Sequence, residues 1–599
     1  MKIADLIDKG RKEENARRVL RGEDPLPDTI NDGKLVHFLI DINIDGVQLF
    51  HNSEQAGIIP ILAVIYSGNH SADSTEDPVV IQLRHPFVIG FYIGKSKPDL
   101  TKFLEPLFAE LNRLCPNNVD PEATKGREFT ASLRCVIADS PMRAYLKKCK
   151  GHSGYWSCER CIQKGISTLV SGNKKETIEF RELNAPPRTD EDFATYCKSD
   201  ESVDDHISNP NNVGPFYEFG FCVISGFVID PMHTMSAGAF GRRLRGITLK
   251  ASEGKLEVAE LKQADYRINM FRGCKPYEFE RFLRPLKSSV KKYKHHELRD
   301  FMMYYLFPVF NGLLKKNQLE NILLLQYSMI LLGGFQTTEI PANDITEATR
   351  ILKLYVQQLI DFQIPIRPTT HAIIHLPEDV ANFKCGIESL SAYVFENFQG
   401  FFCAHVISGN KTVEQLKNRL IERYKYLLPT LAVGSIITST KLFELEVAKE
   451  ELRNSVGHRI VVDFTIGRGV DPMKKLTFPD MIVTNKFPKN ILLMTNGSVV
   501  VCTDIKEHPE GSNIFWMNCA KFRKLENAFV VPFVSSKYEI YLVSQYSELF
   551  DEFNANKIAA KMFAFPNQLK PDCDKLPNII DPLSSQKWFV TPIRHSLIS

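Results

Sequence analysis

The chain has 599 residues, of which 44% are apolar and 24% are charged. These proportions are typical of globular proteins and, with no low-complexity tract, argue against a disordered chain. The length predicts about two to four domains. The longest apolar stretches, residues 57–66 and 321–335, are too short to cross a bilayer, and no secretory signal is recognised at the start. The thirteen cysteines are scattered and odd in number, so we expect no disulfide framework.

The first 161 residues change character at Gly33. Residues 1–33 are charged and predict a helical lead-in. After them come three strand patterns, a helix, a fourth strand and a helix that begins at Ser140, in this order: 35–46, 57–68, 86–94, 98–114 and 131–139. Three adjacent strands followed by a helix-linked fourth strand are typical of an RNase H-like α/β core. We therefore interpret residues 34–161 as the first part of such a core.

The rest of the chain divides into three segments. Residues 162–364 contain several helical patterns and are interpreted as a mostly helical insertion. Residues 365–428 would end the core, with helices at 390–406 and 412–428. Residues 429–599 predict a β-rich C-terminal domain, with strand patterns at 459–466, 480–485, 490–505, 529–534 and 538–544. Within the third of these patterns, Asn496-Gly497 is typical of a hairpin turn.

Three acidic residues are candidates for a catalytic cation site. Asp45 and Asp139 each end a predicted strand, and these two strands are neighbours in an RNase H-like sheet. Glu396 lies in a predicted helix and has a longer reach. Gathered carboxylates repel one another unless cations lie between them, and Mg²⁺ or Mn²⁺ suits such oxygen ligands. Asp41 is a rival to Asp45, and each Asp can instead be an ordinary turn former or helix cap.

A cysteine pair is the second candidate site. Cys158 and Cys161 have the Cys-x-x-Cys spacing that supplies half of a tetrahedral structural zinc site. His371 and His375 are four residues apart, so they can share one helical face and supply the other half. A redox-active pair, or histidines with no ligand role, remain the alternatives. Asp230 and His233 are weaker candidate ligands, and His152 also lies close to the cysteines.

One segment of the chain is strongly basic. Between Gly241 and Arg299 there are sixteen Lys and Arg residues against seven Asp and Glu. Such a segment on an otherwise acidic chain suggests a polyanionic partner, and its exposed cations are the candidate contacts. The candidates are Arg242, Arg243, Arg245, Lys291, Lys292 and Lys294. A solvated helical face or a nuclear-localisation signal is the alternative.

Six segments, taken in order, resemble DDE transposases of the CACTA type (transposase family 21). More distantly they resemble Transib transposases and the V(D)J recombinase core. The segments are DG at 45–46, CVIADSPMRAYL at 135–146, GHSGYWSCERC at 151–161, DPMH at 230–233, HAIIHLPEDV at 371–380 and CGIESLSAYVFEN at 385–397. The resemblance implies a catalytic triad of Asp45, Asp139 and Glu396 that uses Mg²⁺ or Mn²⁺. It also implies zinc held by Cys158, Cys161, His371 and His375.

The implied reaction is cleavage of a DNA strand followed by attack of a 3′-OH on target DNA. The resemblance further implies double-stranded DNA as partner, self-association and a nuclear location. Residues 1–33 contain no recognisable DNA-reading zinc finger. The alternative functions are therefore a domesticated, catalytically silent DNA- or protein-binding factor, and a zinc-stabilised structural protein.

Overall fold

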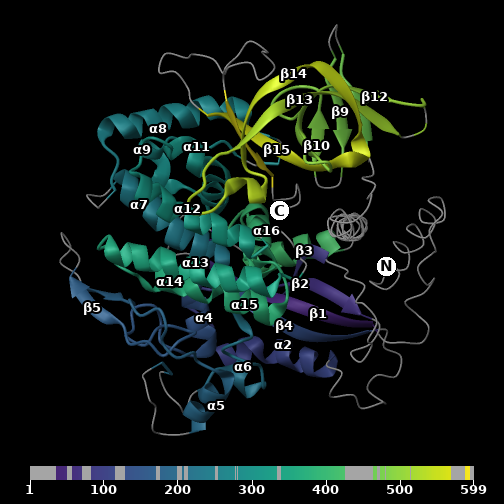
Figure 1. Cartoon of the computed structure of the whole chain (residues 1–599). Coiled ribbons are helices and arrows are strands. Elements are labelled where there is room, and N and C mark those ends of the chain that lie inside the picture. Colours follow the sequence, from purple (N-terminus) through teal and green to yellow (C-terminus); the bar gives the residue numbers. More distant parts are fainter. Residues whose placement is uncertain are drawn as a thin grey trace. The chain divides into compact units, whose positions relative to one another are not determined.

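The computed structural model shows a mixed α/β protein with a C-terminal β-barrel (Figure 1). It describes residues 36–49, 57–69, 83–114, 129–169, 176–198, 206–207, 213–249, 254–276, 278–279, 281–333, 339–409, 411–424, 463–468, 472–478, 481–510, 512, 514–567 and 587–593. The predicted lead-in at 1–33 and residues 429–462 lie outside this set. The chain forms two compact units: unit 1 is Met1–Asp230 with Leu390–Phe443, and unit 2 is Pro231–Ser389 with Glu444–Ser599.

Unit 1 is built on a five-stranded mixed sheet of order β3-β2-β1-β4-β7. Its strands are β1 (Val36–Ile44), β2 (Gly57–Asn69), β3 (Leu83–Gly94), β4 (Phe129–Ala138) and β7 (Phe227–Ile229). The first three pair antiparallel, whereas β4 runs parallel to β1 and β7 runs parallel to β4. The predicted strands in this region, and the pairing of the fourth with the first, are confirmed.

The strand β7 was not predicted, because Phe227–Ile229 falls in the segment interpreted as a helical insertion. All three of its residues are buried. A continuous apolar run of three residues carries no periodicity, so it cannot be distinguished from a buried helical turn by its pattern alone. The short hairpin of β5 (Ile166–Leu169) and β6 (Glu176–Glu179) was missed in the same segment.

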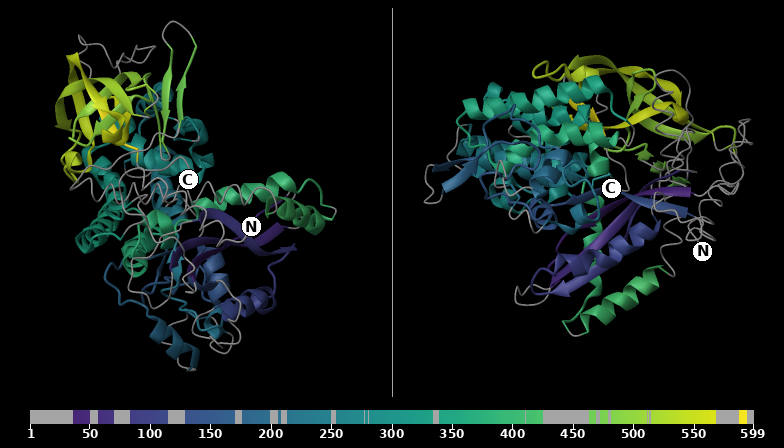
Figure 2. Two further views of the ribbon diagram at one scale, coloured as in Figure 1. Left: turned by 90° about the vertical axis from the view of Figure 1, so that its right-hand side faces the viewer. Right: turned by 90° about the horizontal axis from the view of Figure 1, so that it is seen from below.

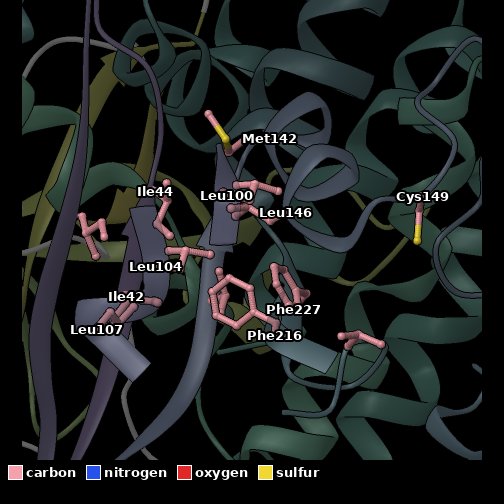
Figure 3. Close-up of a cluster of buried hydrophobic side chains, with 14 of the residues drawn as sticks. Ile42, Ile44, Leu100, Leu104, Leu107, Met142, Leu146, Cys149, Phe216 and Phe227 are labelled. Carbon is pink, nitrogen blue, oxygen red and sulfur yellow. The ribbon is translucent and has the colours of Figure 1, made fainter. Parts of the chain in front are cut away.

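Apolar side chains between the sheet and its helices form the core of unit 1 (Figure 3). The helices α2 (Leu100–Leu114) and α4 (Ser140–Lys147) bury their apolar faces, including Leu104 and Leu146, against β1 and β4. Phe216, from α6 (Pro215–Glu218), packs edge-to-face on Phe227 of β7. Each Å² of apolar surface buried here contributes about 25 cal/mol of stabilising free energy, and this holds the sheet against the helices.

Three further helices complete unit 1: α5 (Asp190–Lys198), α16 (Tyr393–His405) and α17 (Thr412–Glu422). Helix α16 packs against β3, and α2 packs against β4. The left view of Figure 2 shows these two helices on opposite sides of the purple strands. Tyr424, which follows α17, hydrogen-bonds through its hydroxyl to the backbone of Val88 in β3.

Helices make up the first part of unit 2, as predicted for this region. They are α7 (Gly241–Leu249), α8 (Val258–Met270), α9 (Leu286–Ser289), α10 (His295–Asp300), α11 (Leu306–Phe310), α12 (Lys316–Leu331), α13 (Ala342–Asp361), α14 (Pro368–Ala372) and α15 (Leu376–Phe383). Two π-helical segments, Met232–Phe240 and Phe301–Tyr305, precede α7 and α11. In the part of the chain that the structure describes, no helix is long and apolar enough to span a bilayer.

The second part of unit 2 contains a closed six-stranded barrel of order β11-β12-β13-β14-β16-β15 and a small sheet of order β10-β9-β8. The strands are β8 (Asp463–Ile466), β9 (Lys474–Thr477), β10 (Ile482–Thr484), β11 (Ile491–Met494), β12 (Val499–Glu507), β13 (Phe515–Asn527), β14 (Tyr541–Asn554), β15 (Ile558–Pro566) and β16 (Trp588–Pro592). The predicted Asn496-Gly497 turn is confirmed between β11 and β12, where Gly497 has a φ of 79°. The strand predicted at 529–534 is wrong: this segment lies outside the strands, and its Pro532 lacks the N–H that a ladder needs.

The barrel and the helices of unit 2 share an apolar interface. Phe279 packs on Phe563, and Phe307 packs on Phe589. Within this interface Lys561 donates to both carboxylate oxygens of Glu278 at 2.9 Å, and both side chains are 1% exposed. Burial lowers the pKa of Lys561, and the attraction of Glu278 offsets only part of that effect. The interface therefore contains a buried ion pair, and removal of one member alone would leave the other as an unpaired buried charge.

Replacing one member of this pair leaves the other as an unpaired buried charge. We expect Lys561→Met to lower the free energy of unfolding of unit 2 by about 3–5 kcal/mol. The double variant Glu278→Leu/Lys561→Met should recover most of the loss. Urea unfolding, followed by the fluorescence of Trp516 and Trp588, measures this.

The control is Lys587→Met, which removes the exposed ion pair with Glu526 on the barrel surface. Solvent screens that pair, so the free energy of unfolding should not change. If Lys561→Met unfolds at the same urea concentration as Lys587→Met, the buried pair has no structural role.

Candidate metal centre and acidic sheet edge

Four side chains that are far apart in the sequence form one buried cluster. The side chains of Cys158, Cys161, His371 and His375 each offer a ligand atom, and these atoms lie within 4.8 Å of one another. The two sulfur atoms are 3.4 Å apart, and so are the two Nε2 atoms. All four residues predicted to bind zinc are therefore brought together in a cluster that can bind a metal such as zinc.

The dimensions of the cluster fit a tetrahedral ion. Zinc–ligand bonds of about 2.0–2.3 Å separate neighbouring ligand atoms by about 3.3–3.8 Å. The hydrogen bond to Cys158, together with burial, raises the pKa of the Cys161 thiol well above its usual range. Buried thiols of this kind give up their protons when a divalent cation supplies the compensating charge. The weaker candidates Asp230 and His233 are not members of the cluster.

The two residues between the cysteines anchor their loop to unit 1. Glu159 accepts hydrogen bonds from Arg143 at 2.8 Å and from Lys147 at 2.5 Å, and both cations lie on α4. Burial raises the pKa of Glu159, but Arg143 and Lys147 outweigh that effect and hold the pKa well below its usual range. The carboxylate is therefore ionised and fixes the cysteine loop to the helix that follows β4.

A second set of contacts fixes the other side of the loop. Arg160 donates to the backbone carbonyls of Ile224 and Phe227, and the distance to Phe227 is 2.7 Å. Arg188 donates to the carbonyl of Cys158 at 3.0 Å. These roles of Glu159, Arg160 and Arg188 were not predicted, since the only local signal is the presence of charged residues inside the Cys-x-x-Cys motif.

The histidines are held by consecutive short helices. His371 lies in α14, which begins with Pro368, and His375 ends the 3₁₀ turn Ile373–His375. The Nδ1 atom of His375 lies 3.2 Å from a carboxylate oxygen of Glu378. A carboxylate on the second ring nitrogen commonly orients a metal-binding histidine, and Nε2 of His375 is the ring nitrogen that lies 3.4 Å from Nε2 of His371.

The first two candidate acids occupy equivalent positions at the edge of the unit 1 sheet. Asn43 of β1 pairs in parallel with Ile137 of β4, and Asp45 and Asp139 lie two residues further along each chain. Each is the first residue after its strand, and neighbouring strands are about 4.8 Å apart. The register therefore places Asp45 and Asp139 side by side at the carboxyl ends of two parallel strands.

The hydrogen bonds of Asp45 and Asp139 show whether these acids act as turn formers or helix caps. The Oδ1 atom of Asp139 accepts from the N–H of Met142, so Asp139 does cap α4. The Oδ1 atom of Asp45 accepts from the N–H of Gly46. The cap uses Oδ1 of Asp139, and a carboxylate has a second oxygen that can bind a cation. Capping and cation binding are thus compatible at this position.

Asp41, the rival on the same strand, is already neutralised. It is 1% exposed, and Arg134 donates to both of its carboxylate oxygens at 2.6 and 2.5 Å. The guanidinium of Arg134 also lies over the ring of Tyr66 at 3.4 Å. A cation at Asp41 would have to displace this buried ion pair, so Asp45 is the better candidate of the two.

Glu396, the third acid, lies in the first turn of α16 in the same unit. Asp230, the residue after β7, is fully buried and accepts a hydrogen bond from the N–H of Ala392 at 2.9 Å. Ala138 of β4 pairs with Ile229, so Asp230 continues the row of acids formed by Asp45 and Asp139. Asp230 therefore ties the start of the helix that carries Glu396 to the acidic edge of the sheet.

The three catalytic candidates are more widely spread than the metal-binding cluster. Among the described residues, Asp45, Asp139 and Glu396 do not form a group whose donor atoms all lie within 4.8 Å. A pair of catalytic cations is itself about 3.5–4 Å across, so its ligands need not all meet at one point.

The predicted DNA-binding residues separate into two groups. Arg242, Lys291, Lys292 and Lys294 are exposed and Arg245 is half-buried, as a surface role requires. Arg243 is only 5% exposed, and its guanidinium donates to Gln318 inside unit 2. Arg243 is therefore corrected from a phosphate contact to an internal residue, because its helix α7 turns that side chain toward α12.

Comparison with known proteins adds a match in the C-terminal part of the chain. Residues 464–577 match a family described as a domain of unknown function, DUF8592. The match begins in β8 and continues past β15, so it includes most of the barrel strands, whereas β16 lies beyond it. No curated protein matches the chain.

The cluster predicts one zinc ion per chain. Replacing one ligand, as in Cys158→Ser or His371→Ala, should lower zinc affinity by more than the roughly 10–100-fold that loss of an outer contact costs. Uptake of zinc at neutral pH should release about two protons, one from each thiol. Elemental analysis of the purified protein, with calorimetry in buffers of different ionisation enthalpy, measures both.

The matched control is Cys403→Ser, because Cys403 is an exposed cysteine outside the cluster. It should retain the full zinc content. Equal zinc content in Cys158→Ser, His371→Ala and Cys403→Ser would show that the cluster is not the site.

Asp230→Ala should destabilise unit 1 by about 1–3 kcal/mol, because the buried N–H of Ala392 loses its acceptor. Asp230→Asn keeps a carbonyl oxygen in place and should lose less. Urea unfolding gives the stability, and hydrogen exchange of the peptide that spans the start of α16 reports the cap directly. Equal exchange in both variants would contradict a capping role.

Proposed function

We propose that the protein is a metal-dependent DNA strand-transfer enzyme, a DDE transposase that cleaves a DNA strand and joins it to target DNA. One observation carries the proposal: Asp45 and Asp139 occupy adjacent register positions at the carboxyl edge of two parallel strands. The third acid, Glu396, lies on a helix that Asp230 ties to the same edge.

The topology of unit 1 supports an RNase H-like core. Three antiparallel strands are followed by two more that run parallel to the first, in the order β3-β2-β1-β4-β7. In this interpretation residues 231–389 interrupt the core between β7 and the helix with the third acid. The resemblance to CACTA-type transposases implies an RNase H-like fold.

Each acid has a role that its position allows. Asp45 and Asp139, on rigid strand ends, would hold the cations, and Glu396 would complete the shell of one of them. Two Mg²⁺ or Mn²⁺ ions, when bound, activate the attacking oxygen and stabilise the leaving one in phosphoryl transfer. Asp230 would be a positioning residue, because it binds the start of α16, the helix that carries Glu396.

Zinc would have a structural role in this protein. Its proposed ligands are two thiolates and two imidazoles, a closed set that leaves no position for a substrate. A zinc ion in the cluster would join residues 158–161, whose loop is bonded to α4, to residues 371–375. This connection would restrain the conformation of the segment that precedes Glu396.

Double-stranded DNA is the proposed partner, and the exposed cations of residues 241–299 are its proposed contacts. Affinity that depends on phosphate contacts falls steeply with salt. We further propose a nuclear protein that acts as a homo-oligomer, as the resemblance implies.

The test is nicking of supercoiled DNA by purified protein with Mg²⁺ or Mn²⁺. Asp139→Asn is the most informative variant, because Asn caps helices as well as Asp but lacks the charge that holds a cation. Asp139→Asn, Asp45→Asn and Glu396→Gln should each reduce nicking by about 100-fold or more. The control is Glu105→Gln, an exposed acid on α2, which should nick like the unmodified protein.

The outcome also separates the proposal from its main alternative. Salt-sensitive DNA binding without metal-dependent nicking would favour a catalytically silent DNA-binding factor. Nicking that survives in all three variants would come from a contaminant or another site and would refute the assignment of the triad.

A further inference from the structure

Three arginines gather on one part of unit 2. Arg242 and Arg245 lie three residues apart on α7, so they share one face of that helix. The Nη2 atom of Arg242 donates to Oγ1 of Thr369 at 3.1 Å. Thr369 lies two residues after Arg367, which precedes α14. The contact therefore brings the face of α7 beside Arg367, more than a hundred residues later in the chain.

The charge of this cluster is not balanced by neighbouring acids. Within the described residues, Arg242, Arg245 and Arg367 form no ion pair, whereas Arg134, Arg143 and Arg284 are each bonded to a carboxylate. Burial, Arg367 and Arg245 together lower the pKa of Arg242. Three cations held close together without a counter-charge are stabilised by any anion that binds among them.

The groups available in the cluster suit a phosphate. Guanidinium groups present planar pairs of donors that match phosphate oxygens. The Thr369 hydroxyl accepts from Arg242, so its own hydrogen can still be donated to a ligand. The positive surface also continues beyond the three arginines, because α7 packs against the 3₁₀ turn Val290–Lys292, where Lys291 and Lys292 are exposed.

We propose that Arg242, Arg245, Arg367 and Thr369 form a binding site for a phosphodiester group of a DNA backbone. This inference rests on the proposed function for its ligand, and it adds Arg367 and Thr369 to the DNA contacts. An extended polyanion suits the cluster better than an isolated phosphate, because the line of exposed lysines along residues 291–294 would remain unused by a single ion.

The test compares single variants in binding to a short fluorescent DNA duplex, measured by anisotropy over a range of salt concentrations. Arg367→Ala should weaken binding of unrelated duplexes equally and reduce the slope of log affinity against log salt by about one. Arg242→Ala should do the same. Arg367→Lys should retain the salt slope, because the charge remains at the site.

The matched control is Arg350→Ala, which removes an exposed arginine that is already paired with Glu347. Its affinity and salt slope should match those of the unmodified protein. Thermal unfolding of every variant shows whether a loss of binding follows from a loss of structure.

The possible failures are distinguishable. If the unmodified protein does not bind DNA, the proposed function itself fails. If it binds, but Arg367→Ala and Arg242→Ala keep its affinity and salt slope, the arginine site alone is refuted. An equal loss of salt slope in Arg367→Lys and Arg367→Ala would also overturn it, because the slope reports the charge at the site, which lysine keeps.

Discussion

The parallel pairing of β1 with β4 is the constraint on which the acidic edge of unit 1 depends. Parallel strands present their carboxyl ends at the same edge of a sheet, so the register that pairs Asn43 with Ile137 also sets Asp45 beside Asp139. The pairing of β4 with β7 adds Asp230 to the row. Placing several carboxylates together costs electrostatic energy. The capping N–H of Met142 and the nearby cation of Arg143 offset part of this repulsion, and in our proposal bound cations offset the rest.

The cysteine loop shows how the same helix serves two sites. Helix α4 is capped by Asp139, and it carries Arg143 and Lys147, which bind Glu159 between the two cysteines. Arg143 donates to the carbonyl of Ala138 as well, at the end of β4. One short helix thus connects the acidic edge of the sheet to the cysteine loop of the candidate metal site.

Several parts of the fold and sites could be predicted because their signals are local. The strands β1 to β4 have apolar runs of ordinary length. The spacing of the Cys-x-x-Cys motif by itself indicates either half of a zinc site or a redox pair. Other parts depend on partners that are distant in the chain. The three residues of β7 carry no period, the buried state of Arg243 depends on Gln318, and the function of Asp230 as a cap is visible only with Ala392 in place.

The sequence by itself determined which side chains can do chemistry: the acids at strand ends, the cysteine and histidine pairs, and a basic segment. Spacing and periodicity report such features because they arise from contacts within a few residues. Only the tertiary structure shows that Asp41 is paired, because its partner Arg134 lies more than ninety residues away in the chain. It likewise grouped Arg367 with Arg242, because burial and pairing are set by neighbours that the linear order of the chain does not reveal.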